Sequence, residues 1–87
     1  MPRRMLTAEH VRAARALLGW GQRELAQAAG LSVPTIKRVE ASQDVIQANY
    51  ATVLAIQTAL ESAGIEFVHA TDGRVGVTLK KKLPPAG

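Results

Sequence analysis

The sequence predicts a mainly α fold in which four helices are followed by a C-terminal β-hairpin. Before Gly64, apolar residues recur at helical spacing, and glycines and capping residues divide this part into segments. After Gly64 the apolar residues alternate, and an Asp-Gly pair separates two alternating runs. With 87 residues, the chain has room for one domain with a single small core.

The first predicted helix is capped by Thr7 and runs to about Leu18. Gly19 ends it, and Trp20 is expected to pack over the junction with the second helix. The apolar stripe of the first helix is expected to consist of Val11, Ala14, Leu17 and Leu18, with Arg12 and Arg15 off the stripe.

Two short helices joined by a tight turn are predicted next. The first runs from Gln22 to Ala29, and Gly30 follows where a helix C-terminus favours a residue that tolerates positive φ. Ser32 is a good N-cap, and Pro34 fits only in the first turn, so the next helix begins at or near Val33. Two helices separated by about three residues, with Gly in the turn, form a helix-turn-helix unit.

The segment Gly21 to Glu40, GQRELAQAAGLSVPTIKRVE, resembles the helix-turn-helix of the Xre/Cro family, the lambda-repressor-like DNA-binding domains of bacteria and phages. That family has an opening Gln, then Glu-Leu-Ala, a turn Gly, a capping Ser or Thr, an apolar residue inside the recognition helix and a closing Glu. The matching residues are Gln22, Glu24, Leu25, Ala26, Gly30, Ser32, Ile36 and Glu40. The resemblance covers roughly residues 6 to 64 and implies a lambda-repressor-like four-helix domain.

A fourth helix is predicted after a loop from Ala41 to Ala48. Asn49 can cap this helix, which ends before Gly64. Its inward residues are expected to be Val53, Ile56 and Leu60, flanked by Tyr50 and Leu54.

The two alternating runs predict a hairpin over residues 65–80 that replaces the fifth helix of the lambda-repressor-like domain. His69 shares a face with Ile65 and Phe67. A hairpin alone is marginal in water, so it must pack on the helices, pair with another subunit, or both. Its expected dimer contacts are Ile65, Phe67, Val75, Val77 and Leu79. The chain is expected to be a single domain over residues 1–87, with a helix-turn-helix core at 6–64 and a flexible basic tail at 81–87.

The net charge of +4 is unevenly distributed. Residues 1–40 contain seven basic and three acidic residues, whereas residues 41–73 contain four acids and no Lys or Arg. Positive charge is therefore concentrated at the helix-turn-helix end, as a phosphate-binding surface requires.

The charge and the resemblance together define candidate DNA contacts. Lys37 and Arg38 lie on the exposed side of the second motif helix and can reach base edges or phosphates. Val33 and Pro34 stand where the family has a polar pair, so base readout is expected to depend more on Thr35, Arg38 and DNA shape. By resemblance, Gln22 contacts a phosphate. The full predicted set is Gln22, Arg23, Ser32, Val33, Pro34, Thr35, Lys37, Arg38, Ser42 and Gln43.

Other classes of function find little support in the sequence. The chain has no Cys, and His10 and His69 lie on different elements, so no metal site or cofactor is expected. No catalytic constellation can be assembled, and an aromatic content of 3% argues against binding single strands by base stacking. No apolar run has the length of a membrane span or signal peptide, which predicts a cytoplasmic protein.

The sequence thus predicts a sequence-specific transcription regulator that binds double-stranded DNA, acting as a repressor. It is expected to form a homodimer on a short palindrome, with half-sites about 34 Å apart. The alternative is an antitoxin or anti-activator-type module, in which Val33 and Pro34 contact a protein partner, a toxin or another regulator. The sequence leaves open whether the hairpin or the fourth helix makes the dimer contact.

Overall fold

The computed structural model describes residues 6–41, 49–69 and 75–80. The helices are α1 (Ala8–Leu18), α2 (Gln22–Ala29), α3 (Val33–Glu40) and α4 (Tyr50–Ser62), followed by strands β1 (Ile65–His69) and β2 (Val75–Leu79). The predicted fold of four helices and a hairpin is confirmed. The predictions for Ser42, Gln43 and the tail at 81–87 fall outside the described residues.

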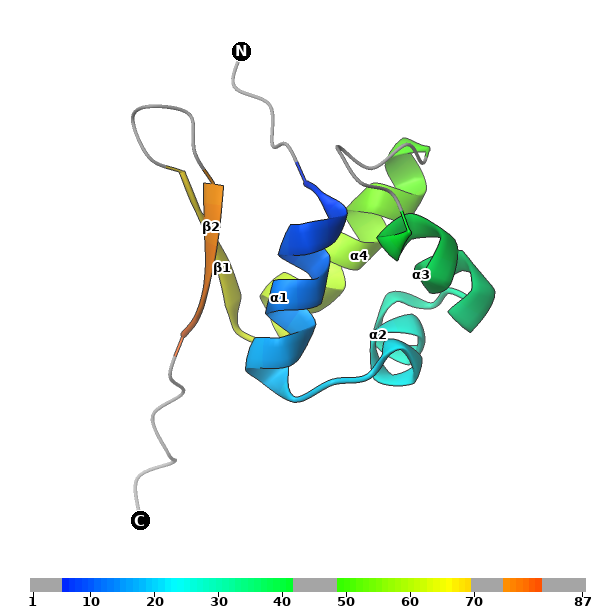
Figure 1. Cartoon of the computed structure of the whole chain (residues 1–87), viewed down its shortest axis with the longest axis horizontal. Coiled ribbons are helices and arrows are strands. Elements are labelled where there is room, and N and C mark those ends of the chain that lie inside the picture. Colours follow the sequence, from blue (N-terminus) through cyan, green and yellow to red (C-terminus); the bar gives the residue numbers. More distant parts are fainter. Residues whose placement is uncertain (1–5, 42–48, 70–74, 81–87) are drawn as a thin grey trace.

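Helix α1 occupies the middle of the molecule, with the hairpin on one side and α2 and α3 on the other (Figure 1). The hairpin therefore lies at the opposite end of the molecule from α3. None of the described helices has the length and apolar content needed to cross a bilayer.

The helix ends follow the predicted caps. Thr7 Oγ1 accepts the N–H of His10 at 3.2 Å, and Asn49 Oδ1 accepts the N–H of Thr52 at 2.8 Å. Gly19 and Gly30 end α1 and α2 at φ of 71° and 70°, values that L side chains rarely adopt. These local rules explain why the helix bounds were predictable.

All four helices contribute to one hydrophobic core. Burying a side chain of this size contributes about 1.5 to 3 kcal/mol. The largest fully buried side chains are Leu25, Ile36, Ile56, Leu60 and Val11. Ile65, at the start of β1, is also buried in this core, which anchors the hairpin to the helices.

One of the predicted core positions on α1 is wrong. Leu17 is 44% exposed, because a residue six positions after Val11 lies about 120° away from it around the helix. Trp20, in the segment between α1 and α2, packs against the core. Its half-buried indole lines a groove between α2 and α4.

The strands pair antiparallel, with Ile65 opposite Leu79 and Phe67 opposite Val77. These residues share the face turned to the helices, as the alternation predicted, and β2 packs mainly on α1. Ile65, Phe67 and Val77 thus pack within their own subunit, whereas Leu79 is exposed and the side chain of Val75 lies outside the described set. That the hairpin also contacts a second subunit stays a prediction.

Gly64 at the α4–β1 junction is expected to be intolerant of a side chain. Its φ is 111°, and an added Cβ would lie 3.3 Å from Leu79 Cδ1. Gly64→Ala should lower the free energy of unfolding by more than about 1 kcal/mol in urea titrations. In Gly76→Ala the new Cβ meets no atom within 4 Å, so this control should be neutral or stabilising. Equal losses for the two variants would contradict the role given to Gly64.

Candidate nucleic-acid interface

The turn between α2 and α3 is built from short-range hydrogen bonds. After Gly30, the N–H of Leu31 returns to the carbonyl of Ala26 at 2.9 Å and closes α2. Ser32 Oγ then accepts the N–H of Thr35 at 3.2 Å and opens α3. The turn is therefore fixed by the chain itself, and the direction in which α3 leaves it is set locally.

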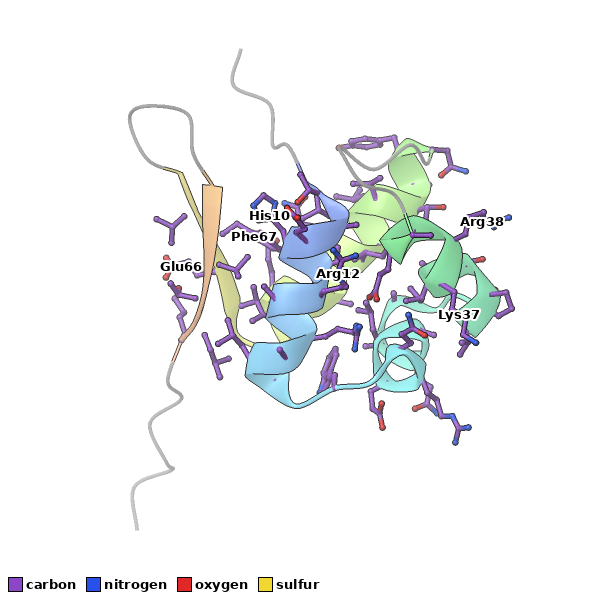
Figure 2. The ribbon with its side chains drawn as sticks, viewed as in Figure 1. His10, Arg12, Lys37, Arg38, Glu66 and Phe67 are labelled. Atoms are coloured by element: carbon purple, nitrogen blue, oxygen red, sulfur yellow. The ribbon has the colours of Figure 1, made fainter. Side chains whose placement is uncertain are left out.

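Helix α3 has one buried face and one exposed stripe. Ile36 and Val39 are buried in the core, whereas Pro34, Lys37 and Arg38 are exposed at spacing i, i+3 and i+4. Figure 2 shows Lys37 and Arg38 on the side of α3 turned away from α1 and the hairpin. Within the described part of the chain neither side chain pairs with a carboxylate, so both charges are available to a ligand.

The first turn of α3 is only partly exposed. Val33 is half-buried and packs against the core, so only part of its side chain faces outward. Thr35 is also half-buried, and its Oγ1 lies 2.9 Å from Ser32 Oγ. Ser32 and Pro34 are the exposed members of this turn.

The closing residue of α3, Glu40, is buried and ion-paired. Arg15 reaches it from α1 with two hydrogen bonds, Nε to Oε2 at 2.7 Å and Nη2 to Oε1 at 2.8 Å. The side chains are 4% exposed for Glu40 and 18% exposed for Arg15. The hydrogen bond to Glu40 raises the pKa of Arg15, so the guanidinium stays charged.

Further hydrogen bonds converge on Glu40. Its carbonyl oxygen accepts Arg12 Nη1 at 2.7 Å, and its Oε1 accepts Gln22 Nε2 at 3.1 Å. Arg15 Nη1 also donates to the carbonyl of Trp20 at 3.0 Å, in the segment between α1 and α2. The C-terminus of α3, the N-terminus of α2 and the middle of α1 are therefore fastened to one another.

Gln22 is positioned by this network at the start of α2. Because a carboxylate only accepts hydrogen bonds, Gln22 must turn its amide nitrogen towards Glu40. Arg23, the next residue, is exposed.

A known family matches this part of the chain. The family described as helix-turn-helix matches residues 11–62, which is more than half of the sequence. The chain belongs to the Xre/Cro-type helix-turn-helix family. Among curated proteins, no sequence matches the chain.

Membership of the Xre/Cro family makes the protein a DNA-binding regulator of that type, in a family that is generally not enzymatic. The basic residues of its helix-turn-helix region fall into two groups. Arg15 forms an internal ion pair with Glu40 and Arg12 donates to the Glu40 carbonyl, whereas Arg23, Lys37 and Arg38 are exposed and do not pair with a carboxylate among the described residues. Among the acids of this region, Glu40 is neutralised by Arg15 and Glu24 accepts the N–H of Gly21 at 2.8 Å. The outer surface is left with excess positive charge.

Sequence reasoning missed two residues that position this Xre/Cro interface. Arg12 and Arg15 were recognised only as lying off the apolar stripe of α1, yet both hold the end of α3. Their side chains reach a residue 28 and 25 positions away, beyond any helical spacing. A buried Glu needs a cationic partner. The closing Glu of the family pattern was therefore the feature that could have pointed to these two arginines.

Neutralising Glu40 should destabilise the whole domain. Glu40→Gln keeps the shape of the side chain but leaves the Arg15 charge without a partner, and breaking a buried pair on one side costs about 3 kcal/mol. Glu24→Gln is the matched control, because Glu24 is exposed and should contribute under about 1 kcal/mol. Guanidinium titrations of both variants measure the difference. Losses of the same size would show that the Arg15–Glu40 pair does not hold the fold.

Proposed function

We propose that this Xre/Cro-type protein is a transcriptional repressor that binds double-stranded DNA sequence-specifically, as a homodimer on a short palindrome, with α3 in the major groove. One observation supports it above the others. The exposed stripe of α3 carries Lys37 and Arg38 without internal partners, on a helix whose opposite face is fixed in the core.

The stripe has the chemistry of a groove-reading helix. Arg38 and Lys37 are long enough to reach guanine edges or phosphates. Pro34 has no donor and is suited to contact with a thymine methyl group, while Ser32 and Thr35 offer hydroxyls. Val33 contributes less than a fully exposed residue would, since part of it packs inward.

Contacts to phosphate are proposed at both sides of α3. Gln22 and Arg23 lie in the first turn of α2, where backbone N–H groups and the helix dipole favour an anion. Ser42 and Gln43 follow α3 directly in the sequence and remain proposed contacts outside the described residues. A dimer bound in this way at a promoter blocks RNA polymerase and thereby represses transcription. The protein acts in the compartment that contains the DNA.

Arg38 should carry part of the sequence preference. The cognate site is first selected from a random duplex pool, where a recovered palindrome is expected. Arg38→Ala should then weaken binding to that site by about 1 to 3 kcal/mol and relax the preference at one position of each half-site. Lys80→Ala, which removes an exposed cation from the hairpin end, should leave the preference unchanged. If wild type and Arg38→Ala bind all duplexes equally, specific recognition by α3 is refuted.

The salt dependence of partner binding separates DNA recognition from the antitoxin or anti-activator alternative. A protein that neutralises about six phosphates should lose roughly a thousandfold in affinity between 50 and 200 mM salt. Fluorescence anisotropy with the selected duplex measures this slope. A nearly flat slope would contradict phosphate binding and favour an apolar contact with a protein.

A further inference from the structure

Helix α4 has a solvent-exposed face without charge. From Tyr50 to Leu60 the sequence contains no Lys, Arg, Asp or Glu. Tyr50 is 77% exposed and Leu54 is 44% exposed. The one exposed charge of α4 is Glu61 in its last turn, whereas the other three helices expose Glu9, Arg12, Arg23, Glu24, Lys37 and Arg38. An outer helix face that stays uncharged over about three turns and exposes large side chains such as Tyr50 and Leu54 is typical of a helix covered on both sides.

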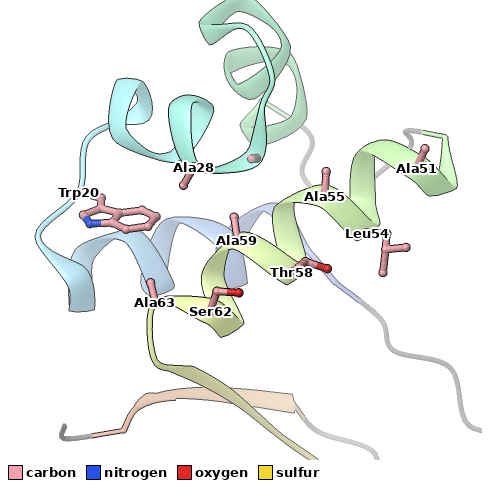
Figure 3. A pocket seen from close by; sticks show the side chains of 10 residues that line it. Trp20, Ala28, Ala51, Leu54, Ala55, Thr58, Ala59, Ser62 and Ala63 are labelled. Atoms are coloured by element: carbon pink, nitrogen blue, oxygen red, sulfur yellow. The ribbon is translucent and has the colours of Figure 1, made fainter.

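Beside this face runs a groove between α2 and α4. Its wall at one end is Trp20, and α2 contributes Ala28 (Figure 3). Its floor along α4 contains a row of small residues at four-residue spacing: Ala51, Ala55, Ala59 and Ala63. None of the residues that line the groove belongs to α3.

The exposed ridge next to the groove changes in size along the helix. Tyr50, Leu54, Thr58 and Ser62 follow one another at the same four-residue spacing and are all exposed. The two residues near the N-terminus of α4 are large, and the two near its C-terminus are small. The ridge is therefore complementary to itself when two copies of α4 run antiparallel, because Leu54 of one copy then faces Thr58 of the other.

We propose that a second copy of this chain packs on this surface, with the two α4 helices antiparallel about a twofold axis. The ridge of each helix then enters the alanine-lined groove of the other. Ridges and grooves formed by residues four apart pack at about −50° with helix axes 8–10 Å apart, and alanines permit the short end of that range. A twofold contact of this kind is closed, so it gives a dimer and no larger assembly.

The distribution of charge selects a second copy over other occupants. Two chains of net charge +4 repel each other least when they meet at a surface free of cations. Helix α4 offers such a surface. DNA has no favourable contact there, because no basic side chain is among the described residues that line the groove. The outer surface of the hairpin, by contrast, exposes Glu66 and Lys80. Because α3 takes no part in the groove, the contact leaves the proposed DNA-binding stripe uncovered. This inference rests on the proposed homodimer and adds the surface that forms it.

The first test measures the mass of the full-length chain by sedimentation equilibrium. Wild type should sediment as a dimer of the 9.3 kDa chain, and Leu54→Glu and Thr58→Glu should sediment as monomers, since each buries a charge in the contact. Leu79→Glu is the matched control on the hairpin, where Leu79 is also exposed, and should remain dimeric. Both changed positions on α4 are exposed, and unchanged circular dichroism would show that the subunits stay folded.

Cysteine cross-linking provides a second readout. The chain has no Cys, so a single introduced thiol reports one contact. Ala55→Cys lies in the groove near the twofold axis and should form a disulfide-linked dimer under mild oxidation, whereas Ala16→Cys, exposed on α1, should not.

Three results would overturn the proposal: a monomeric wild type, dimeric Leu54→Glu and Thr58→Glu, or a dimer that dissociates only in Leu79→Glu. The last would assign the contact to the hairpin. The proposed function is tested separately. If the wild-type dimer dissociates in Leu54→Glu but binds no duplex, the α4 contact is supported and the DNA-binding repressor is rejected.

Discussion

The position of α3 depends on a single buried carboxylate. Glu40 at the end of this helix is held by Arg15 from α1 and by Gln22 from α2, while its carbonyl accepts Arg12. The burial of an unpaired carboxylate would be prohibitively unfavourable, so the pair and its surrounding hydrogen bonds form together or not at all. This requirement fixes the three helices of the helix-turn-helix region relative to one another and leaves little freedom in the angle at which α3 is presented.

The same arrangement determines which charges remain on the surface of the protein. An internal pair removes Arg15 and Glu40 from the surface, and what remains on α3 is positive. Helix α4 contributes buried residues to the same core but has an outer face without charge from Tyr50 to Leu60, and the hairpin packs on the far side of α1. The three surfaces are thus chemically distinct. The proposed functions follow that division, with DNA at α3 and a second subunit at α4.

Much of the fold was predictable because it follows from local rules. Gly19, Gly30 and the caps Thr7, Ser32 and Asn49 set helix ends through contacts within a few residues, and the alternation after Gly64 set the faces of the strands. The predicted stripe on α3 also agrees with the structure for Lys37 and Arg38, since helical spacing alone separates them from Ile36.

What the sequence did not reveal depends on contacts between distant residues. Periodicity places Arg15 off the apolar stripe but cannot say that it reaches a residue in another helix. Similarly, Trp20 lines a groove completed by α4, which only the packed fold brings next to α2. Val33 looked like a groove-facing residue because of its place in the family pattern, yet its packing against the core is decided by the angle between α2 and α3.

The central claim is that the exposed stripe of α3 is the surface that meets duplex DNA. Amide chemical-shift mapping by NMR, with the selected duplex titrated into the full-length protein, tests it most directly. The account predicts that the largest shifts fall on Thr35, Lys37 and Arg38 and on the first turn of α2. Shifts confined to α4 or to the hairpin, with α3 unaffected, would contradict it.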